Sequence, residues 1–124
     1  ADIDADGRLI TPGFINAHMH LYSTFARGLS PKQPPAQNFT EILERLWWPL
    51  DQALTKDDIL YSALVPLIDC IKSGTTTIID HNESPNAIEG SLSVIADACA
   101  EVGVRVLPAY GITDRHGADG ACLV

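Results

Sequence analysis

The stretch Pro12-Gly13-Phe14-Ile15-Asn16-Ala17-His18-Met19-His20 decides how the rest of the chain is interpreted. Successive side chains of a β-strand point to opposite faces, so His18 and His20 share a face with Phe14 and Asn16, and the other face is wholly apolar. Two imidazoles at the end of such a strand can point at one metal ion, because neutral imidazole is a ligand for Zn, Fe, Ni and Cu. The spacing equally fits one hydrogen-bonded histidine beside one exposed histidine, so both interpretations stay open at this point.

Composition excludes several classes of protein. The 124 residues suffice for one domain with a modest core, and 46% of them are hydrophobic. Sixteen acidic residues against eight basic ones give a net charge of −8, and the basic residues are scattered along the chain. Because a nucleic-acid surface needs clustered positive charge, the sequence favours a soluble protein that binds a small molecule and no nucleic acid.

Cysteine usage and hydropathy indicate a compartment. The cysteines form no Cys-x-x-Cys pair and are odd in number, which argues against a thiolate zinc site and against a disulfide framework (Cys70, Cys99 and Cys122). We see neither a signal sequence nor an apolar run of about 18 residues, so no membrane partner is expected. These features predict a reduced protein of the cytoplasm.

A loop and a helix are predicted after the opening stretch. The proline-rich segment 30–37 is predicted to be a loop, either a lid over a site or a solvated excursion. Residues 38–53 have helical spacing, with Asn38 as the N-cap. Pro49 is expected to kink or end this helix, because proline lacks a backbone N–H.

Helix and strand signals then alternate. Residues 55–72 predict a second helix, whose buried stripe is expected to consist of Leu60, Leu64, Leu67, Ile68 and Ile71. Residues 75–81 are rich in β-branched side chains and predict a strand. A third helix is predicted to open at Ser84 and to end at Gly103, and residues 104–110 predict a third strand.

The order of these elements gathers the histidines at one rim. Strands that alternate with helices predict a parallel sheet, and such sheets carry their sites at the carboxyl ends of the strands. His18 and His20 end the first strand, Asp80 and His81 end the second, and His116 lies in the loop after the third. Scattered surface histidines would not need this arrangement, so it favours the metal-site interpretation.

The opening stretch resembles the PGFxxxHxH signature that begins the barrel of the amidohydrolase superfamily. Arg27-Gly28, the tryptophan-containing helix and Ser73-Gly74-Thr75-Thr76-Thr77 are similar to the cytosine deaminase and chlorohydrolase branch of that superfamily. Within this branch the chain resembles the SsnA-like aminohydrolases, and the similar runs cover almost all of it (LYSTFARGLS, NFTEILERLWWPLD, YSALVPLIDC, GTTTIIDH and SPNAIEGSL).

The resemblance implies an α/β fold, a partial TIM (β/α)8 barrel with the first three β/α units and parallel strands. Residues 12–124 would form the N-terminal part of the hydrolase barrel, and residues 1–11 a remnant strand of a small β-sandwich domain. The family implies a divalent metal, usually zinc with iron as the alternative, with His18 and His20 among its ligands. It also implies hydrolysis of a C–N bond in a purine, pyrimidine or related heterocycle by metal-activated water.

The chain lacks parts that the family needs. A complete barrel of this type takes roughly 200 residues or more. The family's later metal-binding histidine, its metal-binding aspartate and its catalytic glutamate lie on strands that this sequence does not contain. We therefore assign no catalytic residue here, and we expect an incomplete and inactive fragment of an enzyme, since a catalytic metal usually has three protein ligands.

The remaining rim residues each have two interpretations. His81 is either a third metal ligand or a residue that faces substrate or solvent, and His116 is assigned to the rim in the same sense. Asp80 either orients a ligand imidazole or caps the turn after its strand. Arg27 either meets a substrate anion or pairs with an acidic neighbour.

A different class of function is compatible with the same sequence. The chain could be a non-catalytic α/β module that binds ligands at the strand-end rim, or one that associates with itself through open parallel-sheet edges. Three strands leave apolar surface uncovered, so a partner surface is expected, either the remainder of the barrel or a second copy.

Overall fold

The computed structural model describes residues 2–29 and 32–115. Helices and strands alternate in it from the first strand onward. Their order is β1 (Phe14–Met19), η1 (Leu21–Ala26), α1 (Phe39–Ile42), η2 (Leu43–Trp47), α2 (Trp48–Ala53), α3 (Lys56–Lys72), β2 (Thr75–Asn82), α4 (Ser91–Val102) and β3 (Arg105–Tyr110).

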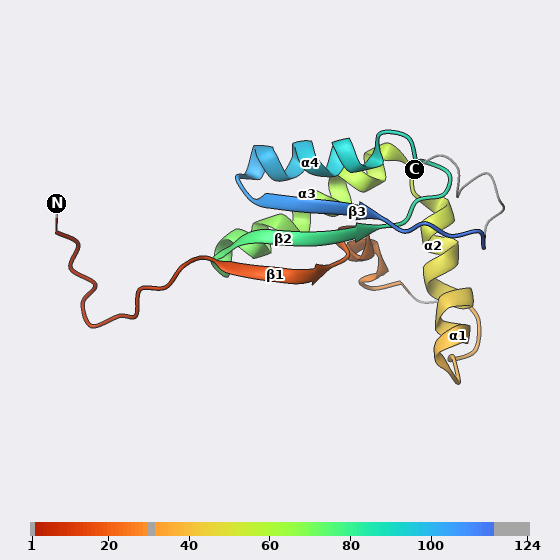
Figure 1. The fold of residues 1–124 in the computed structure, drawn as a ribbon. Helices are drawn as coiled ribbons and strands as arrows, with labels where there is room; N and C mark the ends of the chain where they lie inside the picture. The colour runs from red at the N-terminus through yellow and green to blue at the C-terminus, as the bar shows by residue number, and fades with distance from the viewer. Residues whose placement is uncertain (1, 30–31, 116–124) are drawn as a thin grey trace.

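The three strands form one sheet in the order β1-β2-β3, and both neighbouring pairs are parallel. Helices α3 and α4 pack against each other and lie on the same side of this sheet (Figure 1). The helical run from α1 to α2 stands across the arrowhead ends of the strands (Figure 1). The predicted α/β class with parallel strands is therefore confirmed.

Strand β1 contains a bulge just before the histidines. Asn16 pairs with Ile78 and Met19 pairs with Asp80, so β1 advances by three residues while β2 advances by two. An extra residue in one strand disturbs the regular alternation of side chains and bends the strand locally. The strand therefore changes direction before its carboxyl end. The regular two-residue alternation of side chains does not hold across this bulge.

Helix α3 begins as predicted but buries a different stripe. Thr55 and Asp58 form a reciprocal capping box at its start. Ile68 and Ile71, which were predicted to be buried, are 50% and 52% exposed. The buried face consists of Ile59, Ser62, Ala63, Pro66, Leu67 and Cys70. The prediction was wrong because this helix is apolar on two faces, so periodicity alone does not reveal which face meets the sheet.

The helix that starts at Asn38 does not end at Pro49. Asn38 caps it by accepting a hydrogen bond from the Glu41 backbone N–H, as predicted. The turn that precedes the proline widens into a π-helix, in which the Trp48 N–H donates to the Leu43 carbonyl. This local change accommodates the missing N–H, and the helix continues to Ala53.

The third predicted helix starts seven residues later than expected, at Ser91 rather than Ser84. The preceding segment is held in turns, because the Ala87 N–H donates to the Ser84 carbonyl and the Ser84 N–H donates to the Tyr110 hydroxyl. Gly90 then adopts a left-handed conformation with φ of 79°, which interrupts any helix that begins earlier. The predicted end at Gly103 is confirmed.

The core lies between the sheet and the two long helices. It is formed by apolar side chains from η1, α3, β2 and α4 (Leu21, Ile59, Ala63, Leu67, Ile78, Ile95, Ala98 and Cys99). The segment after β1, for which no regular structure was predicted, joins this core through Leu21, which is 1% exposed. Short helix η1 is thereby fixed beside the end of β1.

The outer strands are open on their far sides. Phe14 and Ile15 on β1 are 60% and 68% exposed, and Leu107 on β3 is 62% exposed. Residues 2–13 form neither helix nor strand and extend away from the sheet (Figure 1). The assignment of residues 1–11 to a strand of a second domain stays a prediction. Among the described residues, no helix combines the length and apolar character that a bilayer crossing requires.

We predict that Gly13→Ala destabilises the protein. A Cβ at position 13 would overlap the Thr76 side chain on the neighbouring strand, and such overpacking typically costs about 1–3 kcal/mol. Urea unfolding of Gly13→Ala, Thr76→Ala and the double variant measures this directly. The double variant should recover much of the loss, and strict additivity of the two changes would contradict the steric explanation.

Candidate metal centre

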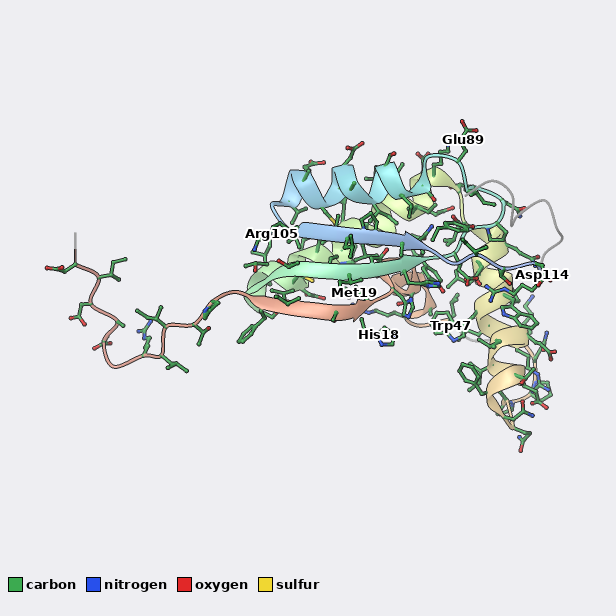
Figure 2. All side chains as sticks on the ribbon, viewed as in Figure 1. His18, Met19, Trp47, Glu89, Arg105 and Asp114 are labelled. Carbon is green, nitrogen blue, oxygen red and sulfur yellow. The ribbon has the colours of Figure 1, made fainter. Side chains whose placement is uncertain are left out.

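His18 and His20 meet at the carboxyl end of β1. Their Nε2 atoms lie 3.0 Å apart, with ring centroids at 4.9 Å and ring planes at 79°. The His18 backbone N–H donates to Asn16 Oδ1 at 3.1 Å. Figure 2 shows His18 at the arrowhead end of β1, the end at which Trp47 also lies. The structure thus brings together the two histidines that the sequence places on one strand face.

The second strand sets the orientation and tautomer of His20. Its Nδ1 atom lies 3.1 Å from the backbone carbonyl oxygen of His81. A carbonyl only accepts hydrogen bonds, so Nδ1 of His20 must carry the proton and donate it. Neutral His20 then has its lone pair on Nε2, the atom that faces His18. A carbonyl in this role is a common outer partner of a metal-binding histidine.

The pair fits two positions of a metal site. Two nitrogen ligands at 2.0–2.1 Å on a tetrahedral ion lie roughly 3.3 Å apart, close to the 3.0 Å between the two Nε2 atoms. Without a cation, the same geometry suits a hydrogen bond from a protonated His18 Nε2 to His20 Nε2. Within residues 2–29 and 32–115, no group of three or more His, Cys, Asp or Glu side chains could hold a metal ion.

The side chain of His81 lies beside this pair. Its ring centroid is 5.2 Å from that of His20, and its Nε2 is 3.8 Å from Glu83 Oε1. Burial and the neighbouring His20 lower the pKa of His81, so its neutral form is favoured. The His81 Nδ1 atom is buried and has no hydrogen-bond partner among residues 2–29 and 32–115. His81 therefore contributes its carbonyl to the centre, and a ligand role for its ring stays a prediction.

Asp80 is buried at the carboxyl-terminal part of β2, and only 1% of the residue is exposed. Its Oδ1 accepts a hydrogen bond from the Leu21 backbone N–H at 2.8 Å, so it caps helix η1 directly after His20. Burial raises the pKa of Asp80 to about 6. The capping interpretation expected a turn after Asp80's own strand, but the turn that Asp80 caps follows β1, and a role in orienting a ligand imidazole stays a prediction.

Arg27 and His116 have different outcomes. Arg27 is exposed, and its Nη1 lies 3.9 Å from Asp69 Oδ2, which is the pairing with an acidic neighbour. It also borders an open cavity of about 440 Å³ that His18 and His20 help to line. His116 lies outside the described residues, so its assignment to the rim stays a prediction.

A chain of polar contacts beside the histidines was missed by sequence reasoning. Arg115 Nη2 lies 2.9 Å from Asp51 Oδ2 and also pairs with Glu83. The Tyr22 hydroxyl is hydrogen-bonded to Asp51, and burial together with that carboxylate raises the pKa of Tyr22. One signal was available, since Asp51 falls on the apolar face of its helix four residues after Trp47 and is 1% exposed.

The comparisons with known proteins agree with this fold. The model of the Amidohydrolase family matches residues 9–123. The chain belongs to the amidohydrolase family.

Two curated relatives show what kind of member it resembles. A 5-methylthioadenosine/S-adenosylhomocysteine deaminase of Thermococcus sibiricus is 36% identical over 112 residues, which is 90% of this chain and 24% of the relative. A 5'-deoxyadenosine deaminase of Methanobrevibacter smithii is 35% identical over 112 residues, which is 90% of this chain and 23% of the relative. The chain thus spans about a quarter of the length of these relatives.

A solved structure supports the fold. A mutant of the atrazine chlorohydrolase TrzN from Arthrobacter aurescens TC1, complexed with zinc and atraton, aligns with a TM-score of 0.64 at 24% identity. The alignment covers 79% of this chain and 23% of that one. The three parallel strands and the helices that connect them are therefore a segment of an amidohydrolase barrel, as the resemblance implied.

We predict that Asp80→Ala is more damaging than Asp80→Asn in the full-length protein. Alanine removes the acceptor of the Leu21 N–H, and an unsatisfied buried donor costs about 1–3 kcal/mol. Asparagine keeps an oxygen at that position and removes a buried charge. Thermal unfolding of the two variants at neutral pH distinguishes them, and equal losses would mean that the capping contact is unimportant.

Proposed function

We propose that this chain is part of a metal-dependent aminohydrolase, in which His18 and His20 hold a divalent metal, zinc or iron. The observation that carries the proposal is the 3.0 Å approach of the two Nε2 atoms, with His20 oriented by the His81 carbonyl. Membership of the amidohydrolase family supports it. The ligands and acid–base groups that complete such a centre would come from the later part of the barrel.

The chain's own residues would perform three tasks in this enzyme. The two Nε2 lone pairs would bind the ion, and the His81 carbonyl would keep His20 in the tautomer that can do so. Helix η1, whose first N–H is bonded to Asp80, would lie along one side of the two histidines. A divalent ion bound there supplies Lewis acidity and lowers the pKa of water toward neutrality.

The substrate class follows from the relatives. The deaminases named above act on adenosine derivatives, so we propose hydrolytic removal of ammonia from a purine nucleoside or a related heterocycle. In this assignment, residues 12–124 are the first part of the barrel, and residues 1–11 are the last strand of a small domain. The remainder of the barrel would cover the open edges of β1 and β3.

We predict that the full-length protein binds about one divalent metal per chain and loses it when His18 and His20 are both replaced by alanine. Removing two nitrogen ligands leaves too few donors for tight binding. Metal analysis after dialysis measures the occupancy. Met19→Leu is the matched control, because it conserves volume between the two histidines and should keep the metal. Undiminished occupancy in the double variant would remove the ligand assignment.

We further predict that ammonia release depends on the complete barrel. The full-length protein should deaminate at least one of 5'-methylthioadenosine, S-adenosylhomocysteine and 5'-deoxyadenosine, and chelation should abolish the activity. The 124-residue chain alone should show none, because it lacks the remaining ligands. A coupled ammonia assay measures both. Metal-dependent turnover by the 124-residue chain would refute the proposal that it lacks ligands needed for activity. Metal binding by the full-length protein without turnover of any of the three compounds would refute the proposed substrates.

A further inference from the structure

We propose that Arg115 is a positioning residue of the candidate site, which clamps the helix of residues 39–53 to the ends of β2 and β3 and thereby holds His81 and His20. This proposal rests on the proposed function for its catalytic consequence. Its structural part, the clamp itself, follows from contacts that do not involve a metal.

Arg115 joins three segments that are far apart in the sequence. Its guanidinium pairs with Asp51 on α2 at 2.9 Å and with Glu83 just after β2. Its Cζ atom lies 5.5 Å from the centroid of the Trp48 ring, also on α2. Arg115 itself follows β3. A planar guanidinium suits this place, because it can donate to two carboxylates and lie over an aromatic ring at the same time.

The clamp is connected to the histidines from both sides. On one side, Glu83 Oε1 lies 3.8 Å from Nε2 of His81, whose carbonyl accepts from His20. On the other side, Asp51 is hydrogen-bonded to the Tyr22 hydroxyl, and the Tyr22 ring lies 6.1 Å from the His20 ring. These contacts close a ring that passes through His20, Tyr22, Asp51, Arg115, Glu83 and His81.

Burial makes the positive charge of Arg115 important to this ring. Asp51 is 1% exposed and Glu83 is 8% exposed, so two carboxylates are withdrawn from water beside one guanidinium. A buried charge that loses its partner is strongly unfavourable. Removal of Arg115 is therefore expected to drive Asp51 and Glu83 toward solvent, which moves α2 away from the strand ends and releases His81.

The first test is hydrogen exchange on the full-length Arg115→Gln variant. Peptides from residues 39–53 should exchange about tenfold faster or more, given the strength of charge-assisted hydrogen bonds. Peptides from α3 should keep their rates. Arg105→Gln is the matched control, because the hydrogen bonds of Arg105 within the described residues go to the hydroxyls of Thr76 and Thr77, at the opposite end of β3 (Figure 2). Unchanged exchange in residues 39–53 would overturn the clamp.

The second test separates positioning from charge balance. The triple variant Asp51→Asn, Glu83→Gln, Arg115→Gln carries no charge at these three positions, so its Tm should recover most of the loss seen in Arg115→Gln. Its kcat should stay about tenfold or more below that of the wild type, because neutral amides do not reproduce the forked contacts. Recovery of both Tm and kcat would show that Arg115 serves charge balance only.

Metal content distinguishes a failure of the Arg115 proposal from a failure of the proposed metal-dependent function. Arg115→Gln should retain the metal that the His18 and His20 double variant loses, so reduced turnover with full occupancy supports positioning. Arg115→Lys should restore part of the kcat that Arg115→Gln loses, since lysine carries the positive charge but lacks the planar guanidinium that donates to two carboxylates. If the wild type binds no metal, the proposed function fails, and hydrogen exchange alone then decides whether the clamp exists.

Discussion

The hydrogen bond from His20 Nδ1 to the His81 carbonyl, 3.1 Å long, is the contact on which the candidate centre depends. It joins the carboxyl ends of two parallel strands and turns the free nitrogen of His20 toward His18. Parallel pairing of β1 and β2 is what brings residues 61 positions apart into this contact. The fold therefore supplies the outer partner of the histidine pair, and the pair alone would have no fixed tautomer.

The alternation of strands and helices could be predicted from the sequence, because helix caps and runs of β-branched residues are local signals. It also placed His18 and His20 together, since neighbours on one strand face stay neighbours in any sheet. It failed where one local pattern allows two outcomes. Helix α3 is apolar on two faces, and Gly90 starts α4 later than Ser84 would. It also missed the contacts of Asp51, Glu83 and Arg115, because these depend on how distant segments pack.

Two features fit the proposal that this chain is part of a larger barrel: the open edges of the sheet and the histidine pair, which supplies two candidate metal ligands. Apolar side chains on β1 and β3 remain exposed, and within the described residues no group of three or more His, Cys, Asp or Glu side chains could hold a metal ion. The chain spans about a quarter of the length of its relatives. In the proposed enzyme the candidate site would be one part of a larger centre, whose orienting contacts to His20 and Leu21 are present in this chain.

The most direct test of this account is anomalous diffraction at the zinc absorption edge from crystals of the full-length protein grown with zinc. The account predicts a peak about 2.0–2.1 Å from Nε2 of both His18 and His20, with His20 Nδ1 still bonded to the His81 carbonyl. A metal peak that touches neither histidine, or a His20 ring turned away from that carbonyl, would contradict it.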